Sequence, residues 1–445
     1  MATPQDDYLH PDVEGLDRDN IVAIQRRALT ALGQRLAADP EWTRHFATAG
    51  LDPRDLEDPQ ALAALPTLEK SDLRERYPFP LLTVPVDTVA RFCATSGTTG
   101  LPVVFGFTEY DLRDLLANQM MRVFRTIGLR PDDRVYQGYT GGMWIGGVAM
   151  DIGLEGYAAT NFPLGPGRGE LAVRWLVDQG HTAGFMSLLW YMRLLAMARE
   201  RGIDPKRDWK LRLGLCGGQS IAKAIQDQVE AALPDGFRAH DLYGSTESGG
   251  PVVAVPCPHS HGDDENHLIN EDTVLTEILD PETLAPVGPG EVGEIVITTL
   301  AKQASPVVRW RTRDLVRVSA RPYDCPCGRQ GLPRIGRVMG RSDDMLKVRG
   351  VMVFPSQIED IVAGTEGTVE DAWQIYIGRE QDRLDELEVA VERRARAGRP
   401  ALDIAAAVRT EIAARLGIRA SVDCHDEGVL PRYEGKAQRV IRRQS

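Results

Sequence analysis

Several features that would assign this chain to a broad class of proteins are absent from its sequence. Its 445 residues carry a formal net charge of −12, which argues against a general nucleic-acid binder because such proteins usually carry a basic balance. The N-terminal segment is acidic and lacks the apolar core of a secretory signal. The longest apolar run, residues 186–198, is interrupted by Arg193 and is too short to span a bilayer. We therefore expect a cytoplasmic protein with no nucleic-acid or membrane partner.

Cysteine is also scarce, and its six copies do not make a disulfide framework in a chain of this length. Three of them stand near histidines, and the soft ligands in these two segments are Cys257, His261, His267, Cys325 and Cys327. Three thiolates and one imidazole form a structural zinc site, so we expect a zinc ion here, with His267 or His261 as the fourth ligand. The Cys-x-Cys spacing is tighter than the common Cys-x₂-Cys, and buried thiols beside surface histidines are the competing interpretation.

The bulk composition and the alternation of patterns predict an α/β protein. The chain is 43% hydrophobic and 26% charged, as is usual for globular proteins, and is long enough for about two or three domains. From about residue 88 to 255, short apolar runs alternate with helical spacing, which predicts a mostly parallel sheet covered by helices. Residues 20–37 predict an early helix capped by Asp19 or Asn20.

The pattern of apolar and turn-forming residues changes after residue 270. Short strands separated by Pro/Gly turns predict a β-rich subdomain over about residues 255–335. A polar break at residues 340–344 precedes a smaller α+β segment. We therefore expect an N-terminal domain of residues 1–340 and a C-terminal domain of residues 341–445.

The most informative segment joins hydroxyl side chains to glycines directly after an apolar-alternating run. It reads Ala94-Thr95-Ser96-Gly97-Thr98-Thr99-Gly100. Glycines let main-chain N–H groups approach an anion, and hydroxyls add donors, so the segment predicts a phosphate-binding loop. It lacks the Gly-Lys-Ser/Thr ending of the common P-loop. Taken alone, an ordinary turn is the more frequent reading of such a segment.

A second polar segment follows an apolar run at the end of a predicted strand, where ligands gather in open α/β sheets. It reads Tyr243-Gly244-Ser245-Thr246-Glu247-Ser248-Gly249-Gly250. Tyr243 could stack on a base, Thr246 offers a hydroxyl to a phosphate, and Glu247 could hold Mg²⁺. A glycine-rich turn with one solvated acid is the alternative.

Three further segments complete the set. In residues 309–315, Asp314 at the start of a predicted strand could accept hydrogen bonds from a ribose diol; an Asp paired with a neighbouring arginine is the alternative. Residues 340–350 form the polar break and the run that follows it. Residues 431–439 contain Lys436 in a polar loop, where a lysine is normally solvated surface.

Together and in this order, these segments resemble the adenylate-forming superfamily of acyl-CoA synthetases, and within it the phenylacetate-CoA ligase family. The likeness covers about residues 60–440. It rests on the runs Thr-Ser-Gly-Thr-Thr-Gly, Tyr-Gly-Ser-Thr-Glu, Arg-Thr-Arg-Asp-Leu, Gly-Arg-Ser-Asp-Asp-Met-Leu and Glu-Gly-Lys-Ala-Gln-Arg-Val-Ile. The resemblance implies a large N-terminal adenylation domain, a small mobile C-terminal domain, and ATP-dependent ligation of a carboxylic acid to CoA through an acyl-adenylate.

The resemblance also implies a role for each motif residue. Thr95 to Gly100 would bind the β- and γ-phosphates, Tyr243 to Thr246 would meet adenine and the α-phosphate, and Glu247 would hold Mg²⁺. Asp314 would bind the ribose with help from Arg341, and Asp343 would be the hinge. Lys436 would contact the carboxylate and the α-phosphate, whereas Lys347 and Gly350 would serve the thioester step. Similar Cys and His runs in relatives favour His267 over His261 as the zinc ligand.

Two departures from the superfamily pattern leave alternatives open. The phosphate loop continues as Gly100-Leu101-Pro102 where Gly-Lys-Pro is common, and Arg313 stands where Thr-Gly-Asp has glycine. Arg313 could replace the missing charge or close off the site. A catalytically weakened nucleotide-binding protein is therefore one alternative. Another is an adenylating enzyme that passes its acyl group to a carrier protein or other nucleophile. The resemblance alone suggests a homodimer.

The acid-binding pocket is expected from two glycine-containing segments, which contribute Tyr139, Trp144, Gly147, Cys216, Gly217 and Gly218. Pockets for aromatic acids are largely apolar with a few polar groups. Glycines leave room for a flat ring, so an aryl or arylacetic acid is favoured over a long fatty acid. Ordinary core packing is the alternative for any one of these residues.

Overall fold

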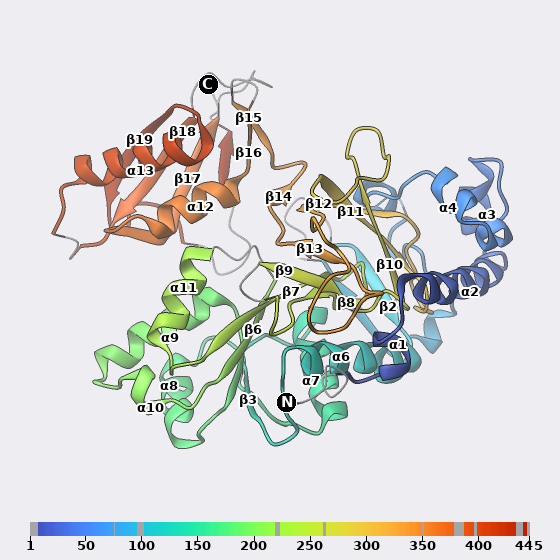
Figure 1. Ribbon diagram of the computed structural model, residues 1–445, viewed down its shortest axis with the longest axis horizontal. Helices are drawn as coiled ribbons and strands as arrows, with labels where there is room; N and C mark the ends of the chain where they lie inside the picture. Colours follow the sequence, from blue (N-terminus) through green and yellow to red (C-terminus); the bar gives the residue numbers. More distant parts are fainter. Residues whose placement is uncertain are drawn as a thin grey trace. The chain divides into compact units, whose positions relative to one another are not determined.

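The computed structural model describes residues 8–74, 76–95, 102–218, 223–260, 264–348, 351–377, 387–395, 398–432 and 439–442. The chain forms two compact units. The first comprises residues 1–218 and 233–337, and the second comprises residues 219–232 and 338–445. Each unit has its own sheet and helices (Figure 1).

The first unit is built on an eight-stranded sheet in the order β13-β9-β8-β7-β6-β5-β3-β4. Its strands are β3 (Arg134–Gln137), β4 (Thr160–Pro163), β5 (Ala183–Phe185), β6 (Leu213–Gly217), β7 (Arg238–Ser245), β8 (Gly250–Val255), β9 (Glu265–Leu268) and β13 (Arg334–Gly336). Strands β7, β6, β5, β3 and β4 are parallel. Strands β8, β9 and β13 continue the sheet in antiparallel fashion. The expected α/β class with a mostly parallel sheet is confirmed.

The first unit also contains helices, which lie around its sheets (Figure 1). They are α1 (Pro11–Glu14), α2 (Arg18–Leu36), α3 (Pro40–Ala47), η2 (Pro53–Glu57), α4 (Pro59–Ala64), α5 (Lys70–Arg74), η3 (Val86–Thr88), η4 (Tyr110–Leu116), α6 (Ala117–Thr126), α7 (Ile145–Tyr157), α8 (Gly169–Asp178), α9 (Leu188–Glu200) and α10 (Pro205–Asp208). Helices α6 and α7 pack on each other and on β8, and α8 packs on α9.

Helix α2 begins earlier than its sequence pattern indicates. Its N-cap is Asp17, whose side chain accepts a hydrogen bond from the Asn20 N–H. The prediction of Asp19 or Asn20 as the cap was therefore wrong. Several aspartate and asparagine residues compete at this position, and the apolar spacing that marks the helix begins only at Ile21.

Two smaller sheets complete the first unit. Strands β1 (Arg91–Ala94) and β2 (Val104–Phe107) form an antiparallel hairpin. Strands β10 (Val274–Leu279), β11 (Val292–Thr299) and β12 (Trp310–Arg317) pair in antiparallel order. The β-rich stretch expected over residues 255–335 is thus divided, because β9 and β13 at its two ends belong to the eight-stranded sheet.

The second unit contains a four-stranded sheet in the order β19-β18-β17-β20. Its elements are α11 (Lys223–Ala232), β14 (Gly340–Arg341), β15 (Leu346–Val348), β16 (Val351–Val353), α12 (Pro355–Gly364), β17 (Thr368–Ile377), β18 (Leu387–Arg393), α13 (Ala401–Leu416), β19 (Ala420–Asp426) and β20 (Val440–Arg442). Side chains from α12, α13 and the strands form one hydrophobic core that includes Trp373, Val389, Val408 and Ile412. Burial of an apolar face on each element explains why this unit folds around its own core.

Across the described residues of both units, every helix is too short or too polar to cross a membrane.

Candidate active site

The candidate phosphate loop is carried by the β1–β2 hairpin. At its base, the Thr95 N–H donates to the main-chain oxygen of Val103 at 3.0 Å, and the Val103 N–H donates to Thr95 Oγ1 at 3.2 Å. These bonds hold the two ends of the connecting segment together. Five residues of the predicted loop lie outside the described residues: Ser96, Gly97, Thr98, Thr99 and Gly100.

The second motif forms the connection between β7 and β8 and is held rigidly. The Ser248 hydroxyl donates to the main-chain oxygen of Gly250 at 2.8 Å and accepts a main-chain N–H three residues earlier at 2.9 Å. A Cβ at Gly244 would lie 2.4 Å from the Gly250 oxygen, so this close approach requires glycine. The turn presents half-buried Thr246 and Glu247 at the carboxyl end of β7, where ligands gather in α/β sheets.

Tyr243 and Asp314 lie together, although 71 positions separate them in the sequence. The Tyr243 hydroxyl donates to Asp314 Oδ2 at 2.7 Å. This hydrogen bond involves only the hydroxyl of Tyr243 and not its ring. Asp314 lies inside β12 rather than at the start of a strand, so the sequence-based position of this strand was wrong by several residues. The reason is an irregularity in β12.

A bulge in β12 sets the position of Asp314. Glu294 of β11 faces Leu315, whereas Val296, two positions on, faces Arg311. Arg313 takes the extra length with a φ of +67°, the left-handed conformation that glycine adopts at least cost. Bulges redirect individual side chains. Arg313 therefore adopts a backbone conformation that favours glycine, the residue common at this position of the related motif.

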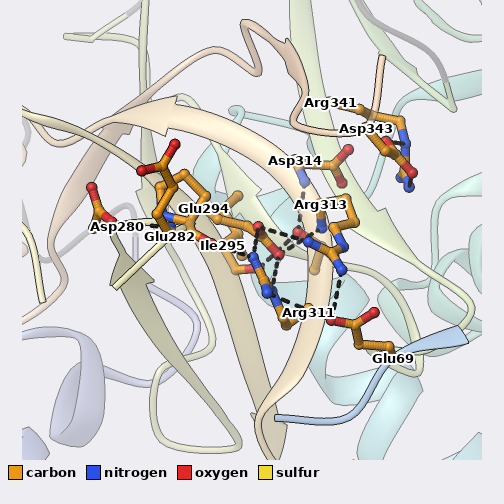
Figure 2. A network of polar contacts seen from close by, with 12 residues as sticks. Glu69, Asp280, Glu282, Glu294, Ile295, Arg311, Arg313, Asp314, Arg341 and Asp343 are labelled. Carbon is orange, nitrogen blue, oxygen red and sulfur yellow. Dashed lines mark hydrogen bonds and ion pairs between the residues drawn. The ribbon is translucent and has the colours of Figure 1, made fainter. Parts of the chain in front are cut away.

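Buried charges hold this bulge (Figure 2). Glu294 is fully buried and accepts two hydrogen bonds from the Arg311 guanidinium, at 3.0 and 2.7 Å. The Arg313 main-chain N–H donates to the same carboxylate at 3.2 Å. Glu69 lies 2.6 Å from Nη2 of Arg313 and 3.5 Å from Nη1 of Arg311. The charge of Arg313 is thus already paired within the first unit.

The residues expected to line the acid pocket meet at the ends of β3 and β6. The Tyr139 hydroxyl accepts a hydrogen bond from the Gly217 N–H at 2.8 Å and donates to the Leu215 oxygen at 3.3 Å. Burial raises the pKa of Tyr139 well above its ordinary value, so the phenol is neutral. A Cβ at Gly218 would lie 4.0 Å from the ring of Trp144, which is 42% exposed. The Trp144 ring, Gly218 and the Tyr139 phenol therefore lie together at the carboxyl ends of β3 and β6.

Two other expected pocket residues are more enclosed. Cys216 is 1% exposed. Gly147 lies in α7, and a Cβ there would lie 2.0 Å from the main-chain oxygen of Thr140. Close packing of the helix start against that carbonyl accounts for this glycine, and no open space lies beside it.

In the second unit, the Arg341 guanidinium donates to both carboxylate oxygens of Asp343, each at 2.9 Å. The main chain of Lys347 belongs to β15 and is opposite Met352 of β16. The side chain of Lys347 lies outside what the structure describes, as do Gly350 and Lys436.

Four predicted metal ligands come together in the first unit, although they come from two segments that are distant in the sequence. The ligand atoms of Cys257, His267, Cys325 and Cys327 all lie within 4.8 Å of one another, and all four residues are buried. The Cys257 and Cys325 Sγ atoms are 3.6 Å apart, and Cys327 Sγ is 3.4 Å from His267 Nε2. A tetrahedral zinc with Zn–S of about 2.3 Å and Zn–N of about 2.0 Å would separate such atoms by about 3.5–3.8 Å. These residues therefore fit the ion; His261 lies outside the described residues.

The surroundings of this cluster orient its ligands. His267 Nδ1 donates to the Leu332 oxygen at 3.2 Å, which leaves Nε2 for the cluster. Hydrogen bonds from Cys325 and Cys327 hold the pKa of the Cys257 thiol well below its ordinary range, which favours a thiolate. These features are typical of a structural metal site with no open coordination position.

A buried ion pair connects the N-terminal segment to the cluster. Arg329 is 1% exposed and donates from Nε to Glu14 at 2.9 Å. Its guanidinium lies 4.7 Å from the centre of the Tyr8 ring, and the Tyr8 hydroxyl donates to the Cys327 oxygen at 2.8 Å. The cysteine loop and α1 are therefore held against each other.

Sequence reasoning missed Glu69, Glu294 and Lys302. A glutamate or lysine outside a recognised motif is normally exposed, and that default hides such residues. The one available signal was their place in the sequence, because Glu294 interrupts an apolar strand and Lys302 lies shortly after the end of that strand.

Comparisons with known proteins agree with this geometry. The AMP-binding enzyme family matches residues 40–301, and the AMP-binding enzyme C-terminal domain matches residues 350–444. A phenylacetate-coenzyme A ligase of Pseudomonas putida is 36% identical and covers 90% of this chain and 89% of its own length. That of Escherichia coli (strain K12) is 34% identical over 96% of both chains.

A solved structure is also similar to this chain. The 2-hydroxyisobutyryl-CoA ligase, in its postadenylation state with 2-HIB-AMP bound, superposes with a TM-score of 0.85 at 26% identity. It covers 96% of this chain and 90% of its own.

The fold and the ordered motifs define an AMP-binding enzyme of the adenylate-forming class. Within that class the chain belongs to the phenylacetate-CoA ligase family, which confirms the resemblance in its sequence. It is an AMP-forming acid–CoA ligase, which joins a carboxylic acid to CoA with ATP through an acyl-adenylate.

Proposed function

We propose that the acid joined to CoA by this enzyme is an aryl or arylacetic acid. The observation that carries the proposal is the cluster at the carboxyl ends of β3 and β6, where Trp144, Gly218 and the half-buried Tyr139 meet. A flat ring could lie against an aromatic side chain and a glycine, and a neutral phenol adds little cost to an apolar site. The related phenylacetate-coenzyme A ligases support the same substrate class.

For the first half-reaction we assign a carboxylate oxygen of the acid as nucleophile. It bonds to the α-phosphorus of ATP, the bond to the bridging oxygen breaks, and pyrophosphate leaves. Two anionic groups must be held in line while charge develops, so fixed positive charge and positioning supply the catalysis. Residues 95–100 would bind the β- and γ-phosphates, Thr246 the α-phosphate, and Lys436 both the carboxylate and the α-phosphate.

Asp314 would bind the ribose hydroxyls, and Tyr243 would meet the adenine. The hydrogen bond between these two side chains and the charged network behind the β12 bulge support the assignment, because both hold Asp314 in one orientation. In the second unit, Arg341 would assist with the ribose. Mg²⁺ bound through the half-buried Glu247 would offset charge on the triphosphate.

In the second half-reaction the CoA sulfur bonds to the acyl carbon, AMP leaves, and the thiol proton passes to solvent. We assign Lys347 and Gly350 to this step and Asp343 to the hinge between two arrangements of the C-terminal domain, residues 341–445. Two chemical steps on one adenylate need two sets of neighbouring groups, and domain rotation provides them. We also propose that the protein is located in the cytoplasm and assembles as a homodimer.

We further propose that Cys257, His267, Cys325 and Cys327 bind a structural Zn²⁺. Their spacing, their burial and the hydrogen bond on His267 Nδ1 support this assignment. The ion would hold the two loops together and would take no part in the reaction.

Pyrophosphate release measured with ATP, a panel of carboxylic acids, and CoA present or absent tests the substrate proposal. We expect release that depends on one aryl or arylacetic acid and turns over only with CoA. Strong turnover with a long fatty acid and none with aryl acids would overturn the substrate class. One equivalent of pyrophosphate with no effect of CoA would indicate a carrier protein or another acceptor.

Lys436→Ala supplies the control for the adenylation step. Loss of one strong electrostatic group should reduce pyrophosphate release by about 100-fold or more. Unchanged release would remove Lys436 from this step.

A further inference from the structure

One buried lysine is not used by any of the roles assigned above. Lys302 is 2% exposed, and its Nζ lies 4.1 Å from the ring centre of Phe107 and 5.1 Å from that of Phe105. Within the described part of the chain, this Nζ has no hydrogen-bond partner. A buried ammonium without such a partner is costly, so its presence calls for a functional explanation.

Lys302 lies next to two segments of the proposed ATP site. Phe105 and Phe107 belong to β2, the strand that carries one end of the candidate phosphate loop. Lys302 also lines a small cavity with Ser248 and Gly249, which belong to the turn that carries Glu247. A Cβ at Gly249 would be 3.8 Å from Lys302 Cδ, so the lysine stem runs next to that turn.

The main chain around Lys302 is fixed by other groups. The Asp111 carboxylate accepts the N–H groups of Gln303 and Ala304, at 2.7 and 2.9 Å, and also the Thr108 N–H at 3.0 Å. Arg35 donates to the Lys302 oxygen at 3.0 Å. The aspartate nearest in the cavity wall is therefore engaged with the main chain, and the ammonium is not its hydrogen-bond donor.

The charge state of Lys302 follows from its neighbours. Burial lowers its pKa to about 8, while Asp111 on η4, Cys93 on β1 and Glu247 on the β7–β8 turn act in the opposite direction. The side chain consequently keeps its positive charge at neutral pH. Its field acts through a low-dielectric interior, where one charge is felt over longer distances than in water.

We propose that Lys302 is a positioning residue of the ATP site, whose buried positive charge, next to β2 and the β7–β8 turn, helps to hold the Glu247 carboxylate and the triphosphate. In the sequence, Leu101 stands where the related phosphate-loop motif commonly has lysine. Lys302 would supply a positive charge that the phosphate loop itself lacks at this position. This inference rests on the function proposed above, in particular on Glu247 and residues 95–100 as the triphosphate site.

The test compares Lys302→Met with Lys210→Met, which makes the same change at an exposed position. The two half-reactions are measured separately: pyrophosphate release from ATP with the preferred acid, and thioester formation from synthetic acyl-adenylate and CoA. For Lys302→Met we expect kcat/KM for ATP to fall about tenfold. The KM for the acid and the rate of thioester formation should change less than about twofold, and Lys210→Met should match the original protein.

A second comparison uses Glu247→Gln. If Lys302 acts through Glu247, the effect of Lys302→Met on kcat/KM for ATP should shrink in the Glu247→Gln background. If the methionine variant is poorly produced, the same measurement is made with Lys302→Gln. An unchanged kcat/KM for ATP, or equal losses in both half-reactions, would overturn the inference. Absence of pyrophosphate release from the original protein would instead refute the proposed substrate or function.

Discussion

Replacement of Lys302 by methionine should make the protein more stable at neutral pH. Methionine retains the length and the apolar stem of lysine and fills the space between Phe105, Phe107 and the β7–β8 turn without a charge. The change removes an ammonium that is buried and has no hydrogen-bond partner among the described residues. Removal of a functional charged group from a buried site often raises the free energy of unfolding, because such groups are kept for activity at a cost in stability.

The magnitude follows from the two pKa values of the lysine. In the unfolded chain it titrates near 10.5, and burial lowers the folded value to about 8. Each pH unit between them corresponds to about 1.4 kcal/mol, so below pH 8 the folded state carries a penalty of about 3 kcal/mol. Cation–π contacts with the two phenylalanines offset about 1 kcal/mol. A stabilisation of about 2 kcal/mol is therefore expected for Lys302→Met at pH 7.

The dependence on pH has a definite direction. Between about pH 8 and 10.5 the unfolded lysine is charged and the folded one is neutral, so the original protein gains stability as the pH rises. The advantage of Lys302→Met should therefore shrink over this window and disappear near its upper end. Other groups titrate in both proteins alike and cancel in the difference.

Urea unfolding at pH 7, 8.5 and 10 measures this difference, with Lys210→Met as the matched exposed control. A methionine variant that is less stable than the original protein at pH 7 would refute the reasoning. A stabilisation that stays constant across the pH range would refute it as well, because a packing effect does not titrate.

Three further predictions concern the other sites. Cys325→Ser should release the bound metal, seen by elemental analysis, and should expose the 8–15 segment to limited proteolysis, since Arg329 and Tyr8 tie that segment to the cysteine loop; no metal in the unaltered protein would contradict the zinc proposal. Tyr243→Phe removes a 2.7 Å hydrogen bond to Asp314 and should raise KM for ATP about fivefold while KM for the acid stays constant; equal changes in both would count against the ribose role. Glu69→Gln should weaken the hold on the β12 bulge and lower kcat/KM for ATP by about threefold. The side chains of Arg313 and Glu69 are 28% and 37% exposed, so salt screens this pair and the effect of the substitution should be smaller at high salt.

Much of the architecture and the candidate site could be predicted from the sequence alone. The order of the glycine-rich, hydroxyl-rich and acidic motifs indicated the enzyme class, because each motif is local and carries its own chemistry. Alternating apolar runs indicated the parallel sheet, which β3 to β7 confirm. The cysteine and histidine pattern also indicated the cluster that the fold assembles.

Local pattern was less reliable where tertiary contacts control the backbone. The strand around Asp314 was placed too late because Arg313 adopts a positive φ inside β12, and only the buried Glu294 and its ion pairs make that conformation stable. Likewise, the 255–335 stretch reads as one subdomain, but β9 and β13 find their partners in the large sheet.

The sequence by itself therefore determined the class of reaction, the fold class and the residues with motif chemistry. Only the tertiary structure decided which charged residues outside the motifs are buried. Glu14 meets Arg329 across 315 positions, and Lys302 comes to lie next to a turn that begins more than fifty residues earlier. The physical reason is that burial and electrostatic environment depend on contacts between segments distant in sequence, whereas propensity and motif spacing act over a few residues.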